Sequence, residues 1–136
     1  MTNQLSPELY RVIDANLNRL KEGIRVVEDI VRYRDNNKEL SCKLKHLRHK
    51  AKIQETLELL KERDSINDVL RDTIKSELNR CDISSIIIAN FKRAQESARV
   101  LEELYKLYSA QYSENFKQIR YELYALEKAI LIDASQ

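Results

Sequence analysis

The chain has 136 residues, of which only one is glycine and one is proline, and 34% of its side chains are charged. This length suffices for one core without disulfides or metals, and the scarcity of turn-forming residues predicts an all-α fold. The 24 basic and 22 acidic residues nearly balance, and no segment resembles a signal peptide or a membrane span. We therefore expect a cytoplasmic protein with no nucleic-acid partner and no membrane partner.

The first predicted helix begins where Ser6 stands as an N-cap before Pro7, and apolar residues then recur at helical spacing to about Arg34. The polar run at 35–37 predicts its end. A second helix is then expected to carry apolar residues from Leu40 through Leu60.

A polar stretch at 63–82 predicts a connector, with a short helix through Val69, Ile74 and Leu78. Asp82 or Ser84 is expected to cap the next helix, which carries apolar residues up to residue 105. A last helix is expected from about residue 113 to 132.

The sequence contains an internal repeat. Residues 15–29 align with residues 89–103, which lie 74 positions later, and seven of the fifteen pairs are identical. The second helices also match at an offset of 72, where 44–48 aligns with 116–120. We therefore predict a single domain built from a duplicated helical hairpin, with four long helices and a short connecting helix. The expected parts are repeat 1 at about 7–62, the connector at 63–82, and repeat 2 at about 83–133.

Polar side chains interrupt the apolar face of each first helix. Helical projection turns these polar residues toward the core, with Asn16 near the middle of this face and Arg19 near its edge, and Asn90 and Arg93 take the same places in the second copy. One interpretation is internal pairing, of Asn16 and Arg19 with Glu96 or Glu102 and of Asn90 and Arg93 with Glu22 or Glu28. The other is a polar pocket between the repeats in which guanidinium groups hold an anionic ligand.

A second cluster lies beside this face, where Glu22, Arg25 and Asp29 are close in projection. Such clusters are usually solvated ion pairs, but carboxylates that hold Mg²⁺ beside arginines that hold phosphate would follow the same pattern. Because the chain has a single glycine, glycine-rich phosphate loops are excluded.

Several segments together resemble a known family. These are 10–19 (YRVIDANLNR), 22–29 (EGIRVVED), 44–49 (LKHLRH), 63–65 (RDS) with 68–69 (DV), 89–96 (ANFKRAQE) and 99–103 (RVLEE). They resemble the helical domain that is often fused ahead of thiamine-phosphate synthase, a family associated with hydroxymethylpyrimidine-phosphate kinase activity. Leu70 stands where that family has a glycine.

The resemblance implies a kinase of thiamine biosynthesis that transfers the γ-phosphoryl group of ATP to 4-amino-5-hydroxymethyl-2-methylpyrimidine phosphate, with Mg²⁺ as cofactor. We expect a separately encoded thiamine-phosphate synthase as a partner. The alternative is a non-catalytic helical module that binds a pyrimidine phosphate or docks onto the synthase, and a homodimer stays open. The expected phosphate-binding and substrate-binding residues are Asn16, Arg19, Arg25, Arg48, Asn90 and Arg93, and the expected metal ligands are Glu22, Asp29 and Asp64. The sequence identifies no catalytic base.

Overall fold

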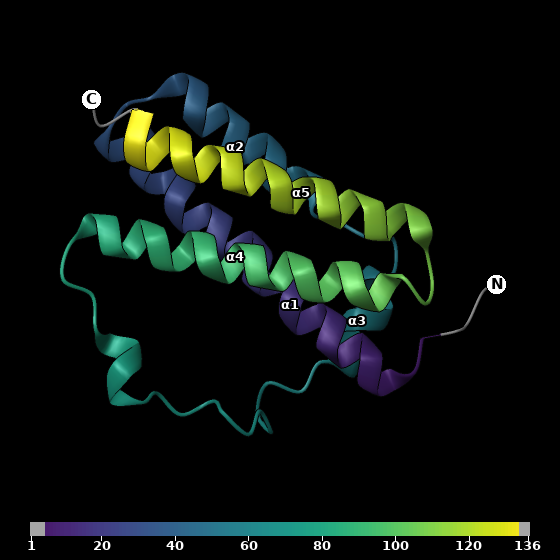
Figure 1. The fold of residues 1–136 in the computed structure, drawn as a ribbon. Coiled ribbons are helices and arrows are strands. Elements are labelled where there is room, and N and C mark those ends of the chain that lie inside the picture. The colour runs from purple at the N-terminus through teal and green to yellow at the C-terminus, as the bar shows by residue number, and fades with distance from the viewer. Residues whose placement is uncertain (1–4, 134–136) are drawn as a thin grey trace.

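The computed structural model describes residues 5–133, and this part of the chain contains helices and no strand. The α-helices are α1 (Pro7–Asp29), α2 (Lys38–Lys50), α3 (Thr56–Glu62), α4 (Ile83–Tyr105) and α5 (Ala110–Lys128). The long helices α1 and α4 pack side by side in opposite directions, while α2 returns along α1 and α5 returns along α4 (Figure 1). The predicted all-α bundle is confirmed.

The start and end of α1 follow from local chemistry. The Ser6 hydroxyl accepts a hydrogen bond of 3.3 Å from the backbone N–H of Leu9, and proline occupies the first helical position. A π-helical turn, Ile30–Arg34, extends the helix to its predicted end. Asn36 then takes a left-handed backbone conformation with φ of 50°, which asparagine tolerates better than most residues.

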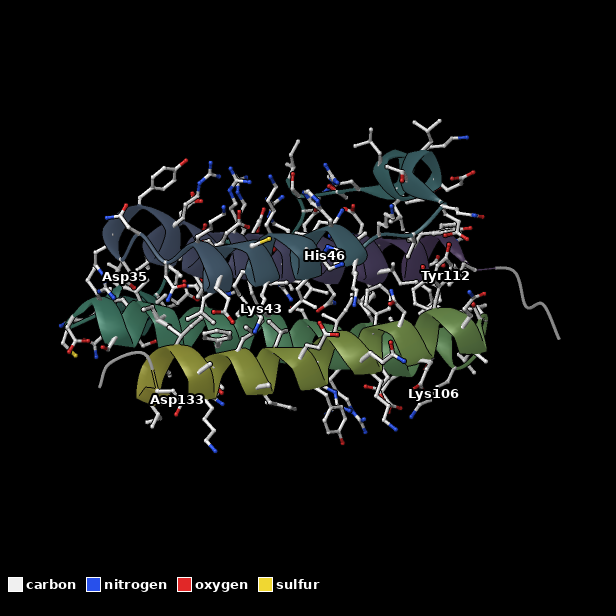
Figure 2. All side chains as sticks on the ribbon, turned by 90° about the horizontal axis from the view of Figure 1, so that it is seen from above. Asp35, Lys43, His46, Lys106, Tyr112 and Asp133 are labelled. Atoms are coloured by element: carbon white, nitrogen blue, oxygen red, sulfur yellow. The ribbon has the colours of Figure 1, made fainter. Side chains whose placement is uncertain are left out.

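The second predicted helix is wrong in its length. Helix α2 ends at Lys50, and α3 begins only at Thr56. The backbone at this break forms hydrogen bonds with side chains of α5. The Asn115 amide donates a hydrogen bond of 3.2 Å to the Lys50 carbonyl, and the Gln54 N–H donates one of 3.0 Å to the Tyr112 hydroxyl. Tyr112 lies near the start of α5 (Figure 2). These bonds replace the helical hydrogen bonds that the break removes.

The predicted connector helix is also wrong. Between α3 and α4 the structure has only a 3₁₀ turn, Lys75–Leu78. The side chains of Val69, Ile74 and Leu78 are all exposed, the first of them by 94%. A short helix gains most of its stability by packing an apolar face, and here no such packing is available.

The second hairpin begins as expected at Asp82. Its carboxylate accepts a hydrogen bond of 2.8 Å from the Ser85 N–H and so caps α4. Helix α5 starts earlier than predicted, since Ser109 caps it and Ala110 is its first residue. A π-helical turn, Ala129–Asp133, continues it to the predicted end.

Each hairpin contains an equivalent ion pair between its two helices, in which the glutamate is buried and the arginine is partly exposed. Arg48 on α2 donates two hydrogen bonds, of 2.8 and 3.3 Å, to Glu28 on α1. Arg120 on α5 donates two, of 3.0 and 2.9 Å, to Glu102 on α4. The two pairs are related by the sequence repeat, and both glutamates are buried in the core.

Apolar side chains from all five α-helices, such as Leu20, Leu44, Leu59, Phe91 and Phe116, form one buried cluster. A membrane-spanning helix, long and apolar enough to cross a bilayer, is not found within residues 5–133.

Candidate functional site

The two repeats form opposite walls of one hollow, which we call the inter-repeat hollow. It measures about 760 Å³ and lies between α1, α4 and the connector. Helix α1 contributes Arg19 and Glu22, and α4 contributes the repeat-related residues Arg93 and Glu96. The connector runs on the side of the α1–α4 pair that faces away from α2 and α5 (Figure 1). The duplication therefore places the same two side chains on both walls.

Arg19 and Arg93 are exposed, in contrast to their predicted orientation toward the core. Within residues 5–133, no salt bridge involves Arg19, Arg93 or the connector residue Arg71, which also lines the hollow. A guanidinium group without a paired carboxylate keeps its five N–H donors available for an anion. Three such groups from three different segments converge here.

The internal pairing predicted for the two asparagines is wrong. Asn16 Nδ2 donates a hydrogen bond of 2.9 Å to the Val12 carbonyl, and Asn90 Nδ2 donates one of 2.9 Å to the Ile86 carbonyl. In each case the acceptor lies one helical turn earlier on the same helix. Asn16 is buried and lines the inter-repeat hollow, whereas Asn90 does not line it.

Asn90 instead lies at a point where α1 and α4 pack tightly against one another. A Cβ atom on Gly23 would come within 2.9 Å of the Asn90 backbone oxygen and 3.3 Å of the Ala94 Cβ. Glycine at position 23 therefore allows α1 and α4, the walls of the hollow, to pack this closely.

Two further predicted phosphate ligands lie outside the inter-repeat hollow and already have partners. Arg48 is bonded to Glu28, and these hydrogen bonds raise the pKa of the guanidinium. Arg25 forms an exposed ion pair of 3.4 Å with Asp29 on the next turn of the same helix. A phosphate role for either arginine stays a prediction, and each would first have to give up its carboxylate.

The three predicted metal ligands occupy three different places. Glu22 lies in the inter-repeat hollow, and Asp29 is paired with Arg25. Asp64 belongs to the connector, where the connector runs beside α1. In the described part of the chain, no three His, Cys, Asp or Glu side chains stand close enough to hold a metal ion by themselves.

The charges of the inter-repeat hollow nevertheless fit a metal that arrives with a polyphosphate. Three arginines there face four carboxylates, namely Glu22, Asp68, Glu77 and Glu96. Mg²⁺ commonly binds through one or two carboxylates together with substrate phosphates and water. Because acids slightly outnumber bases, a phosphate chain accompanied by Mg²⁺ suits this hollow better than a bare one.

A second hollow, of about 610 Å³, lies beside the first along α1, and we call it the α1–connector hollow. Asp14 on its wall accepts two hydrogen bonds, of 2.7 and 2.8 Å, from Arg63 at the start of the connector. The Arg11 guanidinium donates a hydrogen bond of 3.0 Å to the backbone carbonyl of Asp64. Hydrogen bonds from the side chain and the backbone of Asn67 lower the pKa of the Asp64 carboxyl.

Sequence reasoning missed Asp14, Arg63, Asp68 and Arg71 as residues of these hollows. Asp14, Arg63 and Asp68 lie within the segments that resemble the family, and this resemblance could have indicated them as site residues. Arg71 lies outside those segments, and no pattern in the sequence indicated it. Leu70 lines the inter-repeat hollow without a left-handed backbone, because the only non-glycine residue with positive φ in the described chain is Asn36. The chain therefore does not need glycine at position 70.

Comparison with known proteins relates this chain to one family. The model of the ThiD2 family matches residues 11–129. The chain is 39% identical over 129 residues to thiamine-phosphate synthase of Nostoc punctiforme and 40% identical over 130 residues to that of Synechocystis sp.. It is 35% identical over 130 residues to that of Rhodopirellula baltica. The alignments cover 92–94% of this chain but only 35–38% of these relatives. No solved structure matches the chain.

Proposed function

The chain belongs to the ThiD2 family, and from this premise we propose that it acts in thiamine biosynthesis as an ATP- and Mg²⁺-dependent kinase. In the proposed reaction it transfers the γ-phosphoryl group of ATP to 4-amino-5-hydroxymethyl-2-methylpyrimidine phosphate and so forms the diphosphate of this pyrimidine. The name thiamine-phosphate synthase, borne by relatives that are about two-fifths identical over this region, supports the pathway. The observation that carries the kinase proposal is the inter-repeat hollow, where Arg19 and Arg93 lie without paired carboxylates.

The chemistry of this transfer suits such a hollow. One oxygen of the acceptor phosphate forms a bond to the γ-phosphorus, and the bond from that phosphorus to the β,γ-bridging oxygen breaks, so that ADP leaves. Both reactants are anions, so the main task of the protein is to neutralise and align them. Arginine forks at Arg19 and Arg93 supply charge and directional donors for this purpose.

A strong general base is not required for this reaction. The second pKa of a phosphate monoester is about 6, so the attacking oxygen is largely ionised at neutral pH. This agrees with the failure of sequence reasoning to identify a base. Mg²⁺, when bound to the triphosphate, would neutralise further charge on the β- and γ-phosphates, and Glu22, Asp68, Glu77 and Glu96 are the carboxylates placed to receive it.

The proposed product is the substrate of thiamine-phosphate synthase, so we propose a thiamine-phosphate synthase as the functional partner. We propose that the reaction takes place in the cytoplasm, where ATP is available.

The proposal is tested by incubating the purified protein with ATP, Mg²⁺ and the pyrimidine monophosphate and following diphosphate formation by ³¹P NMR. We expect turnover that disappears when EDTA removes Mg²⁺. Arg19→Gln and Arg93→Gln should each lower kcat/KM about 10²-fold, as loss of a donor to the transition state does elsewhere. The matched control is Arg80→Gln, because Arg80 is exposed, donates only to the neighbouring Asn79 carbonyl and lines neither hollow.

Diphosphate formation no faster than in a protein-free control would overturn the kinase proposal. If isothermal titration calorimetry then showed that the pyrimidine monophosphate binds and that Arg19→Gln weakens this binding, the non-catalytic module would be the correct alternative. Absence of both turnover and binding would leave the polar hollow with a purely structural role.

A further inference from the structure

The two hollows on α1 adjoin one another. Asn16, Arg19 and the connector residue Asp68 line both of them. With volumes of about 760 and 610 Å³, each falls within the range of ordinary small-molecule pockets. A reaction between two bound phosphates needs two such spaces that meet at one point.

The hollows differ in how their arginines are used. In the α1–connector hollow, Arg63 is held by Asp14 and Arg11 is held by the Asp64 carbonyl. In the inter-repeat hollow, no salt bridge within the described chain occupies Arg71 or Arg93. Among the described residues, two arginines without a salt bridge, Arg71 and Arg93, therefore line only the inter-repeat hollow, whereas Arg11 is the single such arginine that lines only the α1–connector hollow.

The α1–connector hollow instead offers hydrogen-bonding groups for a polar ring. Asn18 and Ser65 line this hollow, and Asn18 Nδ2 donates a hydrogen bond of 3.2 Å to the Asp14 carboxylate. Amide and hydroxyl groups can donate and accept hydrogen bonds, which is what ring nitrogens and an exocyclic amine require. Arg11 is exposed and stands beside them.

We infer that the inter-repeat hollow binds the nucleoside triphosphate, that the α1–connector hollow binds the aminopyrimidine monophosphate, and that Arg19 contacts the reacting phosphates of both. This assignment rests on the proposed kinase function. The ligand with more negative charge occupies the hollow with the unpaired arginines, and the ligand with the smaller charge occupies the hollow with the amide and hydroxyl groups. Since the hollows are distinct, both ligands bind at the same time and the phosphoryl group passes directly between them.

The test is calorimetric binding of two probes, Mg²⁺ with the non-hydrolysable analogue AMP-PNP and the pyrimidine monophosphate alone. Three variants separate the hollows: Arg93→Gln alters only the inter-repeat hollow, Arg11→Gln only the α1–connector hollow, and Arg19→Gln their junction. All three side chains are exposed, so the fold should survive, and circular dichroism checks this.

Arg93→Gln should weaken AMP-PNP binding about tenfold to a hundredfold and leave pyrimidine phosphate binding unchanged. Arg11→Gln should have the opposite effect, and Arg19→Gln should weaken both. Each probe should still bind to protein saturated with the other.

Mutual competition between the probes would overturn the inference, as would Arg93→Gln and Arg11→Gln weakening the same probe or exchanging their expected effects. The inference and the kinase proposal fail separately. Wild-type turnover together with an exchanged pattern would overturn only the inference. The expected binding pattern without turnover would overturn only the kinase proposal.

Discussion

Arg48 offers a sharp test, because its predicted role as a phosphate ligand conflicts with its position in the fold. Its guanidinium donates to both carboxylate oxygens of Glu28, whose side chain is 1% exposed. Arg48→Met would keep the aliphatic stem and leave that carboxylate buried without its partner. Breaking a buried ion pair in this way typically costs 3–5 kcal/mol, so we expect the free energy of unfolding to fall by about that amount.

The control is Arg25→Met. Arg25 was also a predicted phosphate ligand, but it pairs with Asp29 at 3.4 Å while both side chains are about half exposed. Exposed pairs contribute roughly 0–1 kcal/mol, so this variant should be close to wild type in stability. The contrast between the two arginines isolates burial as the cause.

Urea unfolding followed by far-UV circular dichroism measures both variants. The double variant Glu28→Leu, Arg48→Met should recover part of the loss, because it removes the stranded charge as well as its partner. A loss of less than about 1 kcal/mol for Arg48→Met, or a loss no larger than that of Arg25→Met, would show that the Arg48–Glu28 pair does not stabilise the fold in this way. Folded Arg48→Met protein that keeps its stability but loses binding of the pyrimidine phosphate would show instead that Arg48 is a phosphate ligand.

Three further predictions concern the central helices. The buried hydroxyl of Tyr105 has no hydrogen-bond partner among the described residues, so Tyr105→Phe should leave the free energy of unfolding at pH 7 unchanged or raise it by about 1 kcal/mol; a clear loss would reveal a missed partner. Burial also raises the pKa of Tyr105. The unfolded phenol ionises near pH 10 while the native phenol keeps its proton, so wild-type stability should fall as pH rises above about 10, and Tyr105→Phe should show a smaller fall in the same urea titrations. Gly23→Ala should cost about 1–3 kcal/mol despite the better helix propensity of alanine, because its Cβ would lie 2.9 Å from the Asn90 oxygen; equal or higher stability would show that the helices can move apart.

The long helices were predictable because their signals are local. Ser6 and Pro7 begin α1, Asp82 caps α4, and regular apolar spacing covers the residues between each start and end. The break after Lys50 was not predictable, because it depends on Tyr112 and Asn115, which belong to a helix some sixty residues further along the chain. A short helix through Val69, Ile74 and Leu78 was predicted in the connector, but tertiary packing gives these apolar residues no surface to cover.

The candidate site was predictable in part for a related reason. The repeat showed that Arg19 and Arg93 occupy equivalent places on two helices, and packing of α1 against α4 brings both to one hollow. Helical projection put both arginines at the edge of the apolar face but counted that edge as turned toward the core, whereas in the structure both side chains are exposed. It also could not show that Glu28 and Glu102 are bonded to Arg48 and Arg120 on the second helix of each hairpin.

The most direct test of the central claim, that the repeats build one phosphate-binding site, is a crystal structure with Mg²⁺, AMP-PNP and the pyrimidine monophosphate bound. We predict a triphosphate within hydrogen-bonding distance of Arg19 and Arg93, with the phosphate of the pyrimidine reaching Arg19 from the α1–connector hollow. Phosphates bound elsewhere on the protein, with the inter-repeat hollow empty at saturating ligand, would contradict this prediction.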